Sequence, residues 1–217
     1  MVAPHGPTFF PGIYLGAYFE RELGIPYTAF ATPILFKVPY SLLMMSLTCN
    51  IRSIEPKDFA SFFKEDIGPA AIYAGGFDDV FDNVETPDIL TINVNVKSAL
   101  FVIACKYNRN LIPTLVLNEC DIFTHSDLMV KFCKYVHTHF IRVGIPFPPI
   151  SGSSPFRLPS LMSNKKMLII YGKPLSNDNP DTLTDLYTQS LRDLHKEATD
   201  RGYTNKQLCI KLKGSKL

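Results

Sequence analysis

The pattern of hydrophobic and polar positions predicts a chain of alternating strands and helices. Short apolar runs bounded by glycine, proline or polar residues are typical of strands, and apolar residues three to four apart are typical of amphipathic helices. The predicted strands are 70–76 (with its closing turn), 88–94, 111–119, 165–175 and 209–217. The predicted helices are 14–23, 39–49, 56–65, 97–108, 126–140 and 180–202.

The last two predicted helices differ in character. The helix at 126–140 is amphipathic, and its apolar stripe comprises Leu128, Phe132, Tyr135 and Val136. The helix at 180–202 is polar, begins at a cap formed by Asn179 or Asp181, and stops at Gly202. Residues 1–13 hold three prolines and two glycines and are predicted to form a loop.

The order of the central elements indicates the fold class. A strand at 88–94, a helix at 97–108 and a strand at 111–119 follow one another, which suggests a βαβ unit and a parallel sheet. A length of 217 residues fits one domain. We therefore expect one α/β domain over residues 1–217, with a central mixed, largely parallel sheet flanked by helices.

The composition supports a folded domain with an apolar surface. Hydrophobic residues make up 46% of the chain and charged residues 19%, so a core can form and general disorder is excluded. The formal net charge of +2 is small for a nucleic-acid-binding protein, and no nucleic-acid partner is expected. The 16 Phe, the 10 Tyr and a mean hydropathy of +0.07 fit lipid contact and fit a well-packed α/β enzyme equally.

Neither the cysteines nor the apolar segments indicate a secreted or membrane-spanning protein. The five cysteines form no CxxC pair and no secretory signal peptide opens the chain, so reduced thiols are expected. The most apolar segment, 27–49, contains Pro33, Lys37 and Pro39, which disfavour a straight transmembrane helix. Membrane contact through this chain would therefore be monotopic.

Two glycine-containing segments could carry chemistry. His5 lies in the segment APHG, where an imidazole can serve as a general base on a hydroxyl, although a loop histidine is more often simply solvated. Gly75 and Gly76 precede Asp78 and Asp79 in AGGFDD. That segment is either a loop that binds an anion or substrate, or a turn before a helix whose first residues are acidic.

The segment NECD follows the predicted strand at 111–119. Because ligands bind at the carboxyl ends of parallel strands, Glu119 and Asp121 could orient a histidine or a substrate hydroxyl, or they could be solvated carboxylates. His137 and His139 diverge on a helix and have no acid or cysteine at a zinc-site spacing, so no metal is expected. No G-x-S-x-G elbow is present.

Taken in order, these segments resemble the type-2 diacylglycerol acyltransferase family, which includes monoacylglycerol and wax-ester acyltransferases. The likeness runs through APHG, NIRS, YAGGFDDVFD, the stretch from VKSALFVIACKYN to LIPTLVLNECDIF, PFRLP and IIYGKPL, and so covers essentially the whole chain. Family members carry His-Pro-His-Gly, Gly-Gly-x-x-Glu, an Arg-Lys-Gly-Phe helix before Leu-Val-Pro and Gly-Glu-Asn, and Val-Val-Gly-Lys-Pro. The positions that match these blocks are Pro4, His5, Gly6, Gly75, Gly76, Asp79, Lys97, Glu119, Gly172 and Pro174.

The resemblance implies transfer of an acyl group from acyl-CoA to an acylglycerol hydroxyl, with diacylglycerol to triacylglycerol as the first expectation. It implies catalytic roles for His5, Asp79 and Glu119, with His5 as the general base. Acyl-CoA is then a co-substrate, and neither a cofactor nor a metal is required. Arg52 and Lys97 are the candidates for contact with the CoA phosphates. The implied location is the cytosolic face of the endoplasmic reticulum membrane, or lipid droplets.

Several departures from the family pattern keep alternatives open. Ala3 replaces the first histidine, Asp79 is one methylene shorter than glutamate, and Asn118 replaces the glycine before Glu119. The chain begins at the first block, so we expect a fragment, a trimmed gene or a degenerate member. The alternatives are a non-catalytic lipid-binding relative of the same fold and a soluble α/β enzyme of another kind.

Overall fold

The computed structural model describes residues 2–5, 18–31, 50–53, 56–65, 68–72, 76–86, 88–96, 98–118, 127–140 and 166–214. Its strands are β1 (Val2–His5), β2 (Thr28–Ala31), β3 (Asn50–Ser53), β4 (Ala70–Ile72), β5 (Ile89–Asn95), β6 (Ile112–Leu117), β7 (Leu168–Tyr171) and β8 (Gln207–Lys213). Its helices are the π-helical turn η1 (Tyr18–Glu22), α3 (Pro56–Glu65), α4 (Gly76–Glu85), α5 (Ala99–Lys106), α7 (Asp127–Phe140) and α8 (Pro180–Asp200).

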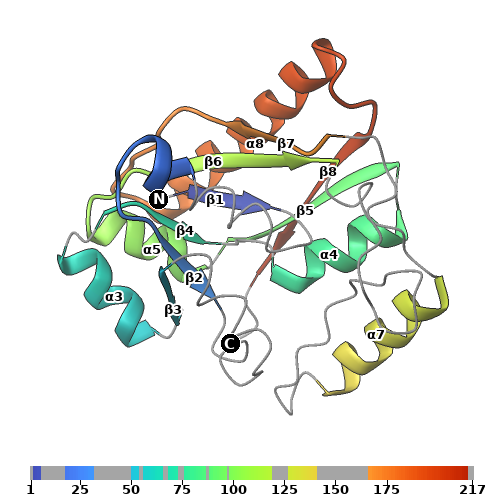
Figure 1. The fold of residues 1–217 in the computed structure, drawn as a ribbon, viewed down its shortest axis with the longest axis horizontal. Helices are drawn as coiled ribbons and strands as arrows, with labels where there is room; N and C mark the ends of the chain where they lie inside the picture. Colours follow the sequence, from blue (N-terminus) through green and yellow to red (C-terminus); the bar gives the residue numbers. More distant parts are fainter. Residues whose placement is uncertain are drawn as a thin grey trace.

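The larger sheet has six strands in the order β3-β2-β4-β1-β6-β7 (Figure 1). The first five strands are mutually parallel, and β7 pairs antiparallel with β6 at the edge. This arrangement confirms the predicted α/β class with a mixed, largely parallel sheet. The prediction of a loop over 1–13 is wrong for Val2–His5, which forms the strand between β4 and β6. Pro4 and the nearby glycines suggested a loop, yet Pro4 pairs with Thr114 in this ladder.

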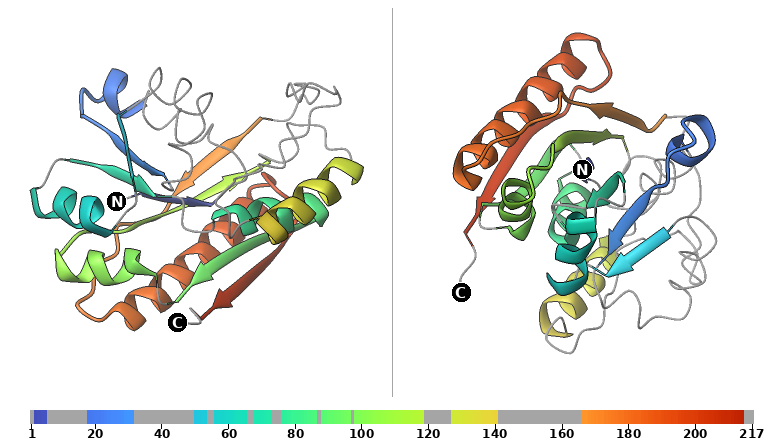
Figure 2. Two further views of the ribbon diagram at one scale, coloured as in Figure 1. Left: turned by 90° about the horizontal axis from the view of Figure 1, so that it is seen from below. Right: turned by 90° about the vertical axis from the view of Figure 1, so that its left-hand side faces the viewer.

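The two faces of this sheet are covered differently. On one face, the main hydrophobic core joins the strand residues Phe30, Ile72 and Leu115 to α3, α5 and α8. On the other face, a smaller cluster joins Ala29 and Ala71 to aromatic residues at η1 and the start of β2. Figure 2 shows α8 and η1 on opposite sides of the sheet. Neighbouring strand residues therefore alternate between a large and a small core, as the pleat requires.

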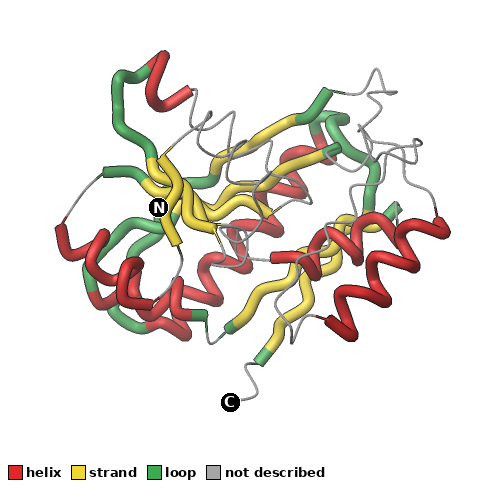
Figure 3. Tube along the Cα trace, turned by 60° about the horizontal axis from the view of Figure 1, so that its bottom comes forward, coloured by secondary structure: helices red, strands yellow, loops and turns green. Residues whose placement is uncertain are grey.

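Strands β5 and β8 form a separate parallel pair, with a continuous register from Ile89–Gln207 to Asn95–Lys213 (Figure 3). The predicted βαβ unit is therefore wrong in its pairing, because β5 and β6 belong to different sheets. Helix α5 still connects them and packs against α8. The residues that keep β5 apart from the larger sheet come from α4 and are described below.

Helix α8 follows its sequence signals closely. Pro180 occupies the first turn, and the Asn179 side chain accepts hydrogen bonds from the backbone N–H groups of Asp181 (2.8 Å) and Thr182 (3.4 Å). Gly202 follows the helix with φ +72°, the left-handed conformation that favours glycine. The cap prediction is confirmed, with Asn179 rather than Asp181 as the capping residue.

Most of the other predicted strands and helices are confirmed in type. Strands at 70–72, 89–95, 112–117, 168–171 and 207–213 and helices at 56–65, 99–106 and 127–140 confirm the predicted types. Of the predicted helix at 14–23, the described part forms the single turn η1, and Gly24, two residues beyond its end, has φ +64°. The predicted helix at 39–49 lies outside the described residues. In the described ranges, no helix combines the length and the apolar character needed to cross a bilayer.

Helix α7 has an unexpected orientation. An amphipathic helix ordinarily turns its apolar stripe to the core. Here Leu128, Phe132 and Tyr135 are 78%, 48% and 58% exposed, while Val130 is buried. The predicted helix is confirmed, but these three residues of its apolar stripe are exposed rather than buried, and the side chain of Val136 is not described.

Candidate functional site

The sheet order brings three of the chemistry-bearing segments to one edge. β4, β1 and β6 are consecutive neighbours and run parallel, so their carboxyl ends meet at the same edge of the sheet. β4 leads to the Gly-Gly segment, β1 ends at His5, and β6 leads to Asn118 and Glu119. In an open parallel sheet, this edge is where ligands bind.

His5 is the last residue of β1 and pairs with Leu115 of β6. The backbone therefore places it at the carboxyl edge, in the strand between β4 and β6. Pro4 precedes it in the same strand and pairs with Thr114. Gly6 lies outside the described residues, and so do Glu119 and Asp121.

The exit of β6 has a distinctive backbone. Asn118, the first residue after the strand, has φ +62°. This left-handed conformation costs glycine nothing and is tolerated by asparagine better than by most residues. The Asn118 side chain also donates to the Lys166 carbonyl at 3.3 Å, which links this exit to the start of β7. The conformation sets the direction in which the chain leaves the strand, immediately before Glu119.

Helix α4 begins at Gly76, so its amino end follows the carboxyl end of β4. Free backbone N–H groups at such an end attract negative charge. Gly75 lies outside the described residues. The prediction of a helix that starts at the aspartates is confirmed in type, but the helix begins two residues earlier than Asp78, at Gly76.

Asp79 lies in this first part of α4 and is only 1% exposed. Its Oδ1 accepts hydrogen bonds from the backbone N–H of Asn93 (2.7 Å) and from Asn93 Nδ2 (2.9 Å). The carboxylate thus binds to β5, in the smaller sheet. The described geometry gives Asp79 a clear structural task, holding α4 against β5.

Asn83, one turn further along α4, repeats this contact. Its Oδ1 accepts from the Thr91 N–H (2.8 Å), and its Nδ2 donates to the Thr91 carbonyl (2.7 Å). Four helical residues rise about 6 Å, and two strand residues span about 6.6 Å. The spacing therefore lets Asp79 bind Asn93 while Asn83 binds Thr91 along one edge of β5. Because these side chains occupy the backbone groups of that edge, none of the described strands of the larger sheet pairs there.

Sequence reasoning missed Asn83 and Asn93. The signal was present: an aspartate and an asparagine lie four apart on a helix, and Thr91 and Asn93 follow two apart among the apolar residues of a strand. All four side chains are buried. Buried polar groups at matching intervals indicate mutual hydrogen bonding rather than solvation.

The network extends to charged groups at its margin. Asn93 Nδ2 donates to Asp82 Oδ2 (3.0 Å), and Lys211 Nζ of β8 lies 3.0 Å from the same oxygen. Burial raises the pKa of Asp82, but the hydrogen bonds from Asn93 and Lys211 and the charges of Lys211 and Lys213 outweigh it, so that this pKa is lowered. On the other side, burial and the charge of Asp79 raise the pKa of Tyr187 well above its usual value.

Arg52, one of the two predicted phosphate-binding cations, is not beside His5 in the sheet. Arg52 lies in the edge strand β3, three strand spacings or about 14 Å from β1. Its guanidinium carbon is 5.5 Å from the centroid of the Phe62 ring on α3, which is a cation–π contact. Lys97, between β5 and α5, lies outside the described residues. The structure thus brings the carboxyl ends of β4, β1 and β6 to one edge and leaves Arg52 in the edge strand β3.

No group of three or more histidine, cysteine, aspartate or glutamate side chains forms a potential metal site among the described residues. His139 is exposed, and its Nδ1 lies 2.8 Å from the Tyr135 carbonyl of its own helix. Cys105 is half-buried on α5, where burial and the charge of Asp178 raise its pKa.

Comparison with known proteins adds no family to this geometry. No protein-family model matches the chain, and neither a curated protein nor a solved structure matches it.

Proposed function

We propose that the protein is an acyl-CoA-dependent O-acyltransferase that esterifies an acylglycerol hydroxyl, with diacylglycerol as the first candidate acceptor. The observation that carries the proposal is the meeting of three segments at the carboxyl edge of β4, β1 and β6. These are the segments in which the sequence resembles the diacylglycerol acyltransferase blocks. A parallel sheet uses this edge for ligands.

In the proposed reaction, His5 accepts the proton of the acceptor hydroxyl as its oxygen attacks the thioester carbonyl. The new C–O bond forms, the C–S bond breaks, and the proton passes from the imidazole to the departing CoA thiolate. Backbone N–H groups at Gly75, Gly76 and the amino end of α4 would stabilise the oxyanion. Glu119 would orient the histidine or the hydroxyl.

Two local geometries support the resemblance. Asn118 occupies the position of the family glycine in Gly-Glu-Asn, and its φ of +62° is one that glycine adopts freely. Gly172 matches the glycine of the Gly-Lys-Pro turn, where a Cβ would come within 2.9 Å of Ser190 Oγ and 3.3 Å of the Pro113 carbonyl oxygen. The two motif positions therefore have backbone requirements that glycine meets.

The remaining predicted residues take supporting roles in this proposal. Asp79, already bonded to Asn93, would position the start of α4 instead of touching substrate. Arg52 and Lys97 would bind CoA phosphates away from the reacting carbonyl. The position of Arg52 in the edge strand β3, three strands from β1, is compatible with such a distant contact. The proposed location is the cytosolic face of the endoplasmic reticulum membrane or the surface of lipid droplets.

The test is acyl transfer from radiolabelled oleoyl-CoA in microsomes of cells that lack neutral-lipid synthesis, with a panel of acceptors. We expect a neutral ester from the wild type and none from His5→Gln. His195→Gln makes the same substitution on α8 and should keep full activity, because glutamine can still donate to the Lys206 carbonyl. Equal turnover by His5→Gln would refute the proposed base.

A second candidate is a lipid-binding relative without turnover. It is favoured by Asp79, which is buried and accepts a hydrogen bond from Asn93 and so is not exposed to a substrate. Asp79→Ala removes the acceptor of both hydrogen bonds from Asn93, whereas Asn93→Ala removes only the one from its side chain and keeps the backbone N–H. A positioning role predicts that each variant loses activity in proportion to its loss of stability, with the larger losses in Asp79→Ala. A catalytic role predicts that Asp79→Ala alone abolishes turnover. Lipid binding by the folded wild type, with no ester formed from any acceptor, would support the second candidate.

A further inference from the structure

Helix α7 presents an exposed stripe that the proposed reaction does not use. Leu128, Phe132, Tyr135 and His139 follow one another at intervals of four, three and four residues, so they share one face of the helix. All four side chains are exposed. The buried Val130 lies on the opposite face. We call these four residues the α7 stripe.

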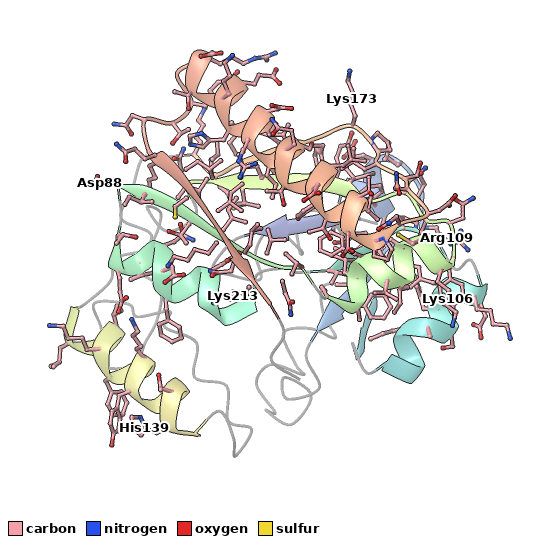
Figure 4. All side chains as sticks on the ribbon, turned by 180° about the vertical axis from the view of Figure 1, so that it is seen from behind. Asp88, Lys106, Arg109, His139, Lys173 and Lys213 are labelled. Carbon is pink, nitrogen blue, oxygen red and sulfur yellow. The ribbon has the colours of Figure 1, made fainter. Side chains whose placement is uncertain are left out.

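The α7 stripe is continuous and ordered. The rings of Tyr135 and His139 lie against each other with centroids 4.1 Å apart, and His139 Nδ1 contacts the Tyr135 carbonyl. Figure 4 places His139 at the outer margin of the molecule, on the side opposite to Lys173. The helix is fixed from its inner side, where Lys134 Nζ binds the Glu85 carboxylate of α4 at 2.6 and 2.7 Å.

One positive charge adjoins the stripe. Lys131 is exposed and precedes Phe132 directly, whereas the charge of Lys134 is offset by Glu85. Apolar and aromatic side chains beside lysine are typical of helices that lie in the interface of a bilayer. Tyrosine suits that interface because its ring is apolar and its hydroxyl polar, and a long lysine side chain can reach the headgroups.

We propose that α7 docks flat on a bilayer that contains anionic lipids, with Leu128, Phe132 and Tyr135 inserted among the headgroups and Lys131 against their phosphates. Anchors at this spacing also occur in helices that bind a protein groove, and the lysine beside the aromatic side chains is what favours an anionic lipid surface here. A lipid surface needs no complementary groove. The inference deepens the proposed function by naming the surface that meets the lipid acceptor, but its test requires no turnover.

The chain has no tryptophan, so a single substitution provides a fluorescent reporter. Tyr135→Trp in the full chain should give a blue shift, and quenching by brominated lipid, on vesicles of equal parts phosphatidylcholine and phosphatidylglycerol. Tyr203→Trp is the matched control, because Tyr203 is 47% exposed and lies beyond α8. Its emission should stay unchanged.

Two further variants separate the apolar and electrostatic parts. Phe132→Ser should weaken partition to these vesicles about tenfold, the lower end of what one inserted aromatic side chain contributes. Lys131→Gln should weaken it about fivefold on the anionic vesicles and leave binding to pure phosphatidylcholine unchanged. Lys173→Gln removes the same charge elsewhere and should have no effect beyond the general loss of net charge.

Unshifted emission from Tyr135→Trp, or wild-type partition by Phe132→Ser, would overturn the proposal. So would a dimer in sedimentation that Phe132→Ser dissociates, because the stripe would then bind a second copy. His5→Gln should bind vesicles as the wild type does. Loss of turnover with intact vesicle binding, or the reverse, therefore shows which of the two proposals has failed.

Discussion

Helices α7 and α8 end in environments opposite to those that their sequences suggested. The helix predicted as amphipathic exposes Leu128, Phe132 and Tyr135, and the helix predicted as polar buries an apolar stripe. Both have apolar residues at helical spacing, and both form where the pattern predicts. The stripe of α8 is fully buried against the sheet, through Leu183, Tyr187, Leu191, Leu194 and Ala198. The α7 stripe is exposed, and the helix contacts the body through α4.

The difference shows that hydrophobic spacing determines the local structure but not the partner. A helix whose stripe meets a sheet contributes to the core, while one whose stripe meets water remains available to another surface. Helix α8 should therefore dominate stability, and α7 should contribute to binding with little effect on stability. Matched substitutions in the two helices test this contrast.

The largest expected effect comes from shortening one leucine in each helix. Leu191→Ala removes a fully buried side chain and leaves a cavity, so we expect a loss of about 2–5 kcal/mol in the free energy of unfolding. Leu128→Ala makes the same change at 78% exposure, and we expect a change within about 0.5 kcal/mol. Urea unfolding followed by circular dichroism measures both. Equal losses would break the contrast and place the α7 stripe in the folded core.

The prediction of α8 from sequence was good because its signals are local. Asn179, Pro180 and Gly202 define the ends within the helix itself. The description of this helix as polar missed its buried stripe, because the stripe is evident only against the core that it packs on. The β1 strand was missed for the opposite reason. Pro4 and nearby glycines are local loop signals, and only the pairing with β4 and β6, far away along the chain, makes Val2–His5 a strand.

The candidate site was predictable in the same partial way. The order of strands β4, β1 and β6 brings the ends that lead to these segments to one edge. A local sequence pattern predicts each strand but not this order. For Asp79, the sequence indicated an acid near a helix start, but the side chain that binds it, Asn93, lies on the next strand. A carboxylate's role depends on its partners, and those are set by packing.

A smaller effect should follow from the close approach of α8 to the turn after β7. A Cβ at Gly172 would lie 2.9 Å from Ser190 Oγ and 3.3 Å from the Pro113 carbonyl oxygen, so Gly172→Ala should cost about 1–3 kcal/mol. Adding Ser190→Ala removes the nearer atom and should recover part of the loss, as a double-mutant cycle in urea would show. Gly214→Ala is the control, because nothing described lies within 4 Å of its Cβ position. Additive costs for Gly172→Ala and Ser190→Ala would mean that α8 does not press on this turn.

The smallest effect is a pH dependence that comes from α8. Burial lowers the pKa of His195 below 6.5, partly offset by its hydrogen bond to the Lys206 carbonyl (2.9 Å). The unfolded chain then binds the proton more readily, so stability is complete above about pH 6.5 and is lost as the pH falls towards the folded pKa. One such group contributes at most about 1.4 kcal/mol per pH unit. His195→Gln should flatten this slope in urea midpoints measured between pH 7 and pH 5. An unchanged slope in His195→Gln would show that other groups titrate in this range and that the buried side of α8 is not the source.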